Sequence, residues 1–230
     1  MKKRSAAYWI FLRVPLWLVA ASVLVVLLFK WVPVRYTPLM LKRSFQFREA
    51  KEYRTQKHWV PLKQISPHLI QAVVSCEDRS FFLHHGFDWP EIRKMVKAHR
   101  TEGKPLRGCS TISQQTAKNV FTFGSRTWAR KAMEGYWTFL IERLWGKRRI
   151  MEVYLNVVET GKGLFGAEAA TRYYYGKSAR KLNRDQAVNL ALCLPSPLER
   201  SPLQLGAKEQ KRRVGIITGI GVIEYPYWAK

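Results

Sequence analysis

The chain has 230 residues and is 47% hydrophobic, so it has room for one domain with a buried core and little room for a second large one. Its 40 Lys and Arg outnumber its 16 Asp and Glu, and the net charge of +24 favours an acidic partner, such as anionic lipid or a phosphorylated molecule. Cys76, Cys109 and Cys193 have neither the even count of a disulfide framework nor the close pairing of a zinc site, so we expect small core residues.

The first predicted element is an apolar stretch from Tyr8 to Val34, interrupted only by Arg13 and Lys30 near its ends. It exceeds the about 20 residues that span a bilayer, and both cations can extend their side chains to the interface. No small-residue cleavage pattern follows, so a retained anchor is favoured over a cleaved signal peptide. The basic residues Lys2 to Arg4 favour a cytoplasmic N-terminus and a single-pass topology, although basic residues after the stretch weaken the asymmetry.

This anchor sets the domain organisation. Residues 1–7 are predicted to be a cytoplasmic N-terminus and residues 8–34 the transmembrane anchor. Residues 35–58 are basic and show little periodicity, which indicates a juxtamembrane linker beside charged headgroups. Residues 59–230 are predicted to form a single folded domain.

Helical patterns dominate the predicted domain. The Ser66-Pro67 pair marks one helix start, and Thr111 with Gln114 and Asn183 with Gln186 form two capping-box patterns. A helical stripe of apolar residues lies between these starts: Met133, Trp137, Leu140, Ile141 and Leu144. Few segments alternate with a period of two, so we expect a mainly α domain.

Glu77 is the most informative single residue. The helix that begins at Pro67 places it on the apolar face, four residues after Val73. A carboxylate half-desolvated in this way suits a general base or acid, whereas a helix-end Glu paired with Arg79 is the structural alternative. The run from Glu77 to Asp88 also contains three acids, two histidines, three phenylalanines and a glycine, and this density favours a functional segment.

Two further polar segments are candidates for substrate binding. Gly108 to Gln115 places hydroxyls and amides at a helix N-terminus, which favours anions and sugar hydroxyls, although ordinary capping explains the same pattern. A cationic group then surrounds Glu134, and it suits a bound pyrophosphate or, equally, a solvated charged face. Its members are Lys118, Arg126, Arg130 and Lys131.

Taken together, these segments resemble a known family. Glu77 to Gly86, Gly108 to Asn119 and Arg130 to Glu134 are similar, in order and spacing, to successive motifs of the family-51 peptidoglycan glycosyltransferases. Ile150 to Asn156 and Gly166 to Lys177 are similar to the next two. One departure is Cys109, where the family often has glycine.

The resemblance implies roles for individual residues. Glu77 and Glu134 would be the catalytic carboxylates, and Glu134 would hold a divalent cation, Mg²⁺ or Mn²⁺, or orient a pyrophosphate. No organic cofactor is implied. The implied substrate-binding residues are Asp78, Phe81, His84, Gly86, Ser110, Thr111, Gln114, Gln115, Lys118, Asn119, Arg126, Arg130 and Lys131.

The resemblance also implies a lysozyme-like helical fold with a small membrane-facing jaw lobe, on the periplasmic face of the inner membrane. The implied reaction polymerises lipid II into β-1,4 glycan strands by inverting transfer and releases undecaprenyl pyrophosphate. The substrates are lipid II and the growing strand, inner-membrane lipids lie alongside, and cell-division or crosslinking proteins are candidate partners. Because no transpeptidase domain follows, the monofunctional members are the nearest match.

Two alternatives are distinguishable from this expectation. A lytic enzyme of lysozyme type would use one acidic Glu and would not need the cations around Glu134. A non-enzymatic basic protein that binds anionic lipid or nucleic acid would tolerate loss of Glu77 and would release its partner as salt rises. Five ordered motifs favour the enzyme, so we expect no nucleic-acid partner. Whether Cys76 and Cys109 form a disulfide stays open at this point.

Overall fold

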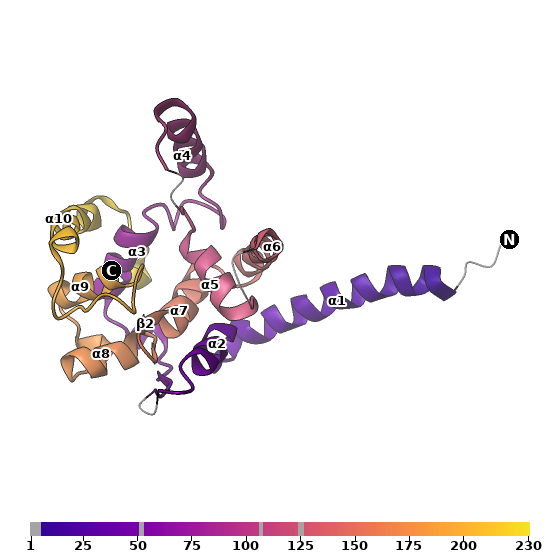
Figure 1. Ribbon diagram of the computed structural model, residues 1–230, viewed down its shortest axis with the longest axis horizontal. Coiled ribbons are helices and arrows are strands. Elements are labelled where there is room, and N and C mark those ends of the chain that lie inside the picture. The colour runs from indigo at the N-terminus through magenta and orange to yellow at the C-terminus, as the bar shows by residue number, and fades with distance from the viewer. Residues whose placement is uncertain (1–5, 51–52, 106–107, 124–126) are drawn as a thin grey trace.

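The computed structural model describes residues 6–50, 53–105, 108–123 and 127–230, with side chains described from Arg13 onward. Helix α1 (Ala6–Trp31) extends away from the body of the molecule, with the N-terminus at its far end (Figure 1). Within it, Arg13–Trp31 is long and apolar enough to cross a membrane, and its side chains are mostly exposed. This is the expected form of the predicted anchor.

The rest of the described chain is mainly helical, which confirms the predicted class. The longer helices are α2 (Pro38–Gln46), α3 (Pro67–Glu77), α4 (Trp89–Glu102), α5 (Ile112–Phe121), α6 (Trp128–Leu144), α7 (Lys147–Val157), α8 (Ala167–Tyr175), α9 (Arg184–Cys193) and α10 (Ala207–Val222). Short 3₁₀ turns lie at η1 (Leu62–Gln64), η2 (Ala179–Lys181) and η3 (Tyr227–Ala229).

A small sheet joins the segment just before residue 59 to the middle of the domain sequence. Strand β3 (Leu164–Phe165) lies between β1 (Gln56–Lys57), which is parallel to it, and β2 (Glu159–Gly161), which is antiparallel. Gly163, in the β2–β3 turn, has φ +76°, a value that favours glycine, and an added Cβ would lie 2.5 Å from the Arg54 carbonyl oxygen.

The core is built around α3. This helix packs against α9 and α10, while α5 packs against α6 and α7, and one continuous apolar cluster runs through both groups. Val73, Ile141, Tyr154 and Leu190 are fully or almost fully buried within it. Burial of each such side chain contributes about 1.5–3 kcal/mol, so the position of α3, and of Glu77 at its end, is well determined.

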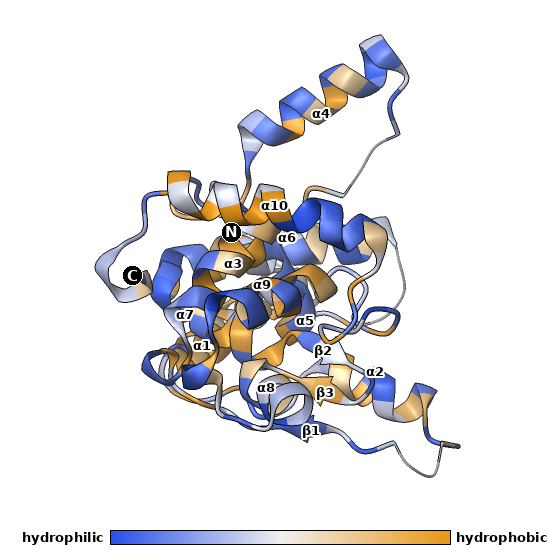
Figure 2. Cartoon of the chain, turned by 90° about the vertical axis from the view of Figure 1, so that its left-hand side faces the viewer, coloured by the Kyte–Doolittle hydropathy of each residue, from blue (hydrophilic) through white to orange (hydrophobic). Residues whose placement is uncertain are grey.

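Helix α4 projects from the body (Figures 1 and 2) and contains no fully buried residue. Asp88 caps its N-terminus, since its Oδ1 accepts a hydrogen bond from the Glu91 N–H at 2.9 Å. Gly103 ends the helix in the left-handed conformation. Assignment of α4 to the small membrane-facing lobe that the family resemblance implied stays a prediction.

The residues predicted to begin helices do so in the structure, with one difference in how a helix is capped. Both capping boxes form, at Thr111 with Gln114 and at Asn183 with Gln186. Ser66 does precede α3, but its hydroxyl donates to the Leu182 carbonyl rather than capping the helix. Its hydrogen bond therefore ties α3 to the segment before α9.

Two expectations need correction. Residues 35–58 were predicted to be an irregular linker, yet they contain helix α2 and strand β1. Arg43 of α2 donates two hydrogen bonds of 2.7 Å to Glu159, so this segment packs on the domain. The apolar stripe of α6 is also incomplete, because Met133 is exposed while Leu140 and Ile141 are buried. The interface of α6 with α5 begins nearer its C-terminal half.

Candidate active site

Glu77 is the last residue of α3 and is half-buried, as its apolar face predicted. The Gln115 amide donates to its Oε2 at 2.9 Å, and the Cys76 thiol lies 3.5 Å from its Oε1. The Tyr154 hydroxyl in turn donates to Oε1 of the Gln115 side-chain amide at 3.4 Å. Complete burial raises the pKa of Tyr154 well above its usual value, so it stays a donor and orients Gln115.

The turn after α3 is held by Asp78, which is buried. Its Oδ2 accepts the Ile112 N–H at 2.9 Å, at the N-terminus of α5, where a negative charge is favoured. His84 Nε2 lies 3.0 Å from both carboxylate oxygens of Asp78. These bonds join the end of α3 to the start of α5, so they fix the position of Glu77 relative to Gln115.

Glu134 on α6 is only 2% exposed and is bound by two cations. Arg130 Nη1 lies 2.6 Å from one carboxylate oxygen and Lys131 Nζ lies 2.6 Å from the other. Lys131 Nζ is also 3.4 Å from the Ser110 hydroxyl. The group carries one net positive charge, on the side of Glu77 where the loop before α5 lies.

Glu134 does not fit a metal ion in this arrangement. Both of its oxygens already bind cations, and a divalent ion would compete with Arg130 and Lys131 for them. Among the described residues, no cluster of three or more His, Cys, Asp or Glu has the geometry to hold a metal. Of the two implied roles of Glu134, these contacts favour orientation of a pyrophosphate, through the Arg130 and Lys131 cations that Glu134 holds.

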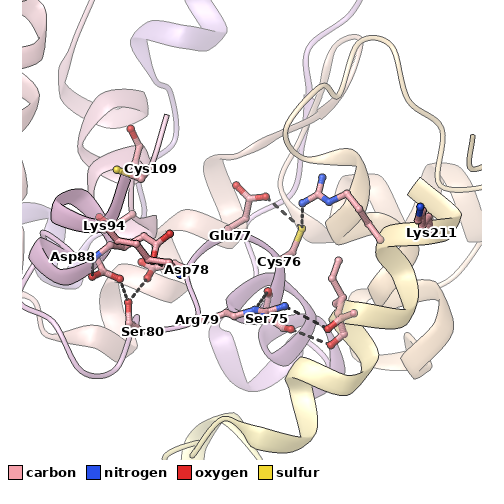
Figure 3. A pocket seen from close by; sticks show the side chains of 16 residues that line it. Ser75, Cys76, Glu77, Asp78, Arg79, Ser80, Asp88, Lys94, Cys109 and Lys211 are labelled. Carbon is pink, nitrogen blue, oxygen red and sulfur yellow. Dashed lines mark hydrogen bonds and ion pairs between the residues drawn. The ribbon is translucent and has the colours of Figure 1, made fainter. Parts of the chain in front are cut away.

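A cavity of about 710 Å³ lies beside Glu77 (Figure 3). Its walls come from the end of α3, the start of α4, the loop before α5, and α10, and in Figure 3 Glu77 lies between Cys109 of the loop and Lys211 of α10. The site is therefore an open cleft lined by both acids and cations: besides Glu77 its walls contain Asp78, Asp88 and Glu91, and the cations Arg79, Lys94, Lys211 and Arg212.

A model of the transglycosylase family matches residues 44–220. The chain belongs to this family. It is 47% identical over 190 residues to a biosynthetic peptidoglycan transglycosylase of Pseudomonas putida. The aligned part covers 82% of this chain and 80% of that relative. A relative of the same name from Pseudomonas aeruginosa is 45% identical over 87% of this chain and 87% of its own length. Another, from Bacteroides thetaiotaomicron, is 45% identical over 86% of this chain and 80% of its own length.

The family motifs divide into residues that face the cleft and residues that build it. Ser110 and Thr111 line the cavity together with Glu77 and Asp78, and Gln115 touches Glu77 directly. Other motif residues are buried supports. Phe81 is fully buried, and Gly86 has φ +96° and accepts a hydrogen bond from the Thr111 hydroxyl through its carbonyl oxygen. Contact of these supports with substrate stays a prediction.

The remaining predicted residues are more scattered. Gln114 and Asn119 are buried in α5, where Gln114 serves the capping box, and Lys118 is exposed on the same helix. Arg126 lies outside the described residues. The cationic cluster is therefore described for Arg130 and Lys131, and the contribution of the other two cations stays a prediction.

The cysteines depart from their predicted role. Only Cys193 is fully buried, while Cys76 and Cys109 are half-buried and line the cleft. All three are free, so the structure contains no Cys76–Cys109 disulfide. Burial raises the pKa of the Cys76 thiol to about 12, and the Glu77 carboxylate adds to this, so Cys76 is a neutral neighbour of Glu77.

Sequence reasoning missed the α10 side of the cleft. Lys211 and Arg212 line the cavity, yet they lie more than a hundred residues after Glu77 and outside the motifs. The only available signal was the run of cations around them, which a solvated helix face explains equally well.

Proposed function

We propose that this protein polymerises peptidoglycan glycan strands from lipid II, with Glu77 as general base. The observation that carries the proposal is the position of Glu77 in the cleft, half-buried, with its Oε2 bound by Gln115 and the Glu134 cation cluster reached through Ser110. The relatives, biosynthetic peptidoglycan transglycosylases, give the reaction class.

In this mechanism Glu77 takes the proton of the acceptor sugar's 4-hydroxyl. The hydroxyl oxygen forms a bond to the anomeric carbon of the growing strand, and the bond from that carbon to the pyrophosphate oxygen breaks. Attack from the opposite face inverts the anomeric configuration. Glu77 keeps Oε2 bound to Gln115, so Oε1, which has only the Cys76 thiol at 3.5 Å beside it among the described contacts, is the oxygen that takes the proton.

The leaving undecaprenyl pyrophosphate gains negative charge as its bond breaks. Arg130 and Lys131 are already fixed by Glu134, so they stabilise that charge without rearranging first. No step needs an organic cofactor. A requirement for Mg²⁺ or Mn²⁺ is a separate prediction, and polymerisation in excess EDTA would contradict it.

The substrate is lipid-linked, and α1 would hold the cleft at the membrane surface. We propose a single-pass topology in the inner membrane, with a cytoplasmic N-terminus and a periplasmic domain. The +24 charge suits a surface rich in anionic lipid. Absence of transpeptidase activity, and association with cell-division or crosslinking proteins, belong to the same proposal.

The test is polymerisation of lipid-linked disaccharide-pentapeptide by the detergent-solubilised protein, with products separated by chain length. We expect polymer from the parent and a loss of about 100-fold or more for Glu77→Gln, in the range that general acid–base catalysis supplies. Glu224→Gln, an exposed carboxylate near the C-terminus, is the matched control and should match the parent.

A lytic enzyme gives a different result in the same assay. It would yield no polymer from the parent but would cleave finished glycan, with cleavage abolished by Glu77→Gln and unaffected by Arg130→Ala. A binding protein would do neither. If a control polymerase works in the same mixture and the parent does not, the proposed function is wrong.

A further inference from the structure

The α10 wall of the cleft is fixed closely against α3. Ile216 and Gly219 of α10 lie on the face toward α3, and the Ser75 hydroxyl donates to the Ile216 carbonyl at 2.9 Å. A Cβ added to Gly219 would lie 2.5 Å from the Ser75 oxygen. Arg212, one helical turn before Ile216, shares this face, so its guanidinium is carried to the end of α3 beside Glu77.

Arg212 differs from the other half-buried arginines among the described residues. That set comprises Arg43, Arg130, Arg149, Arg200, Arg212 and Arg213. All except Arg212 form an ion pair with a carboxylate. Among the residues that the structure describes, the polar neighbour of Arg212 is the Cys76 sulfur, 3.8 Å from Nη2, and a neutral thiol does not balance a guanidinium.

A charge withdrawn from water without a partner is costly, so such a group in a cleft suits an anionic ligand. The guanidinium is also the side chain best shaped to bind a carboxylate or phosphate through two parallel hydrogen bonds. Lys211, exposed on the rim of the same cavity, adds a second cation.

The cleft therefore has cations on both sides of Glu77. On one side, Ser110 of the cleft wall contacts Lys131, which shares Glu134 with Arg130. On the other side, Cys76, next to Glu77, contacts Arg212. The proposed mechanism assigns the first group to the leaving pyrophosphate of the donor strand, and it leaves the α10 side for the molecule whose hydroxyl meets Glu77.

We propose that Arg212, assisted by Lys211, binds an oxyanion of the acceptor substrate and so aligns the acceptor hydroxyl with Glu77. This inference rests on the proposed function. Two parts of a lipid-linked disaccharide-pentapeptide supply that chemistry, its own pyrophosphate and the carboxylates of its peptide. The experiment distinguishes them.

The experiment measures elongation of a labelled, preformed lipid-linked tetrasaccharide at rising concentrations of unlabelled lipid-linked disaccharide-pentapeptide, so that growth of the labelled strand reports the acceptor concentration. We expect Arg212→Ala to raise the acceptor KM about 10-fold or more, the loss typical of a hydrogen bond to a charged group, with a smaller change in kcat. Arg212→Lys should recover part of the loss. Arg213→Ala is the control, because Arg213 binds Asp185 and Asn189 away from the cleft.

A second arm repeats the measurement with a lipid-linked disaccharide that lacks the peptide. If the KM difference between parent and Arg212→Ala persists, the pyrophosphate is the bound group, and if it disappears, a peptide carboxylate is. An acceptor KM that is unchanged in Arg212→Ala overturns the inference. So does an equal loss in Arg213→Ala, or a fall in kcat alone.

The outcomes also separate this inference from the proposed function. A parent that does not elongate the tetrasaccharide refutes the function itself. If Arg212→Ala melts at a markedly lower temperature than the parent, the charge-retaining Arg212→Lys and Arg212→Gln become the deciding pair. Gln keeps much of the side-chain length without the charge, so equal KM values for the two would overturn the inference.

Discussion

At the scale of single residues, Glu77 of the cleft and Glu134 of α6 differ in which groups bind their oxygens. Glu77 accepts one bond from a neutral amide and has a neutral thiol beside its other oxygen, whereas Glu134 is held by two cations. The described contacts of Glu77 are with neutral groups, which suits a general base, whereas both oxygens of Glu134 are occupied by cations. Base and electrostatic support are thus assigned by environment, not by residue type.

This difference predicts the result of Glu134→Gln. The substitution removes the charge that fixes Arg130 and Lys131 while keeping the side-chain shape, so we expect polymerisation to fall about 10- to 100-fold, as when one preorganised donor is lost. Stability should fall by about 1–3 kcal/mol, because the Arg130 pair is mostly buried. Chain-length analysis and urea denaturation measure the two effects.

Arg130→Ala should reproduce the loss of activity. Arg143→Ala, an exposed cation on the same helix, is the matched control and should remain active. Full activity in both Glu134→Gln and Arg130→Ala would mean that this cluster does not support the leaving group.

At the scale of elements, the cleft depends on how closely α10 approaches α3. Gly219 permits that approach, since nothing larger fits beside the Ser75 hydroxyl. Gly215 lies one turn earlier on the same helix, and an added Cβ there meets nothing within 4 Å. The two glycines therefore form a matched pair in one helix.

We predict that Gly219→Ala destabilises the protein by about 1–3 kcal/mol, the usual cost of overpacking, and that Gly215→Ala is neutral or stabilising by up to about 1 kcal/mol through helix propensity. Thermal or urea unfolding of both variants measures this. Adding Ser75→Ala should relieve part of the Gly219→Ala effect, and equal stability of the two alanine variants would contradict the close contact.

At the scale of the whole molecule, the anchor helix is joined to the catalytic body. The Trp145 indole donates to the Val26 carbonyl at 2.7 Å, and Arg149 Nη2 donates to the carbonyls of Phe29 and Val32 at 2.8 and 2.7 Å. The Phe29 carbonyl lies in the last turn of α1, where carbonyls have no partner within the helix, and the other two bonds tie the neighbouring backbone to Trp145 and Arg149. The cleft is therefore held at a set height above the end of α1.

If α1 spans the membrane, retention of the protein in the membrane depends on apolar side chains on the outward face of α1. Leu24 and Leu28 are exposed there, and each arginine would cost up to about 3 kcal/mol, the value for the bilayer centre, with a smaller cost at Leu28 because it lies near the end of the span. We expect the parent to remain in the membrane pellet after alkaline carbonate extraction and the Leu24→Arg, Leu28→Arg variant to be released. Leu24→Val, Leu28→Val is the control that should remain, and retention of the arginine variant would argue against a spanning helix.

Much of this protein was predictable from local sequence. The anchor, the helical class, both capping boxes and Glu77 at the end of an apolar helix face depend on residues within about two turns of one another. The pairing of Arg130 and Lys131 with Glu134 follows from helical spacing in the same way.

Other features depended on contacts between distant segments. Residues 35–58 looked irregular because β1 becomes a strand only by pairing with β3. Cys76 looked like a core residue, although α10 leaves it at the wall of a cleft. Local patterns determined which groups this protein carries and which helices present them. The packing of α10 against α3 decided that Arg212 lies beside Glu77, because residues far apart in sequence meet only when the core is formed.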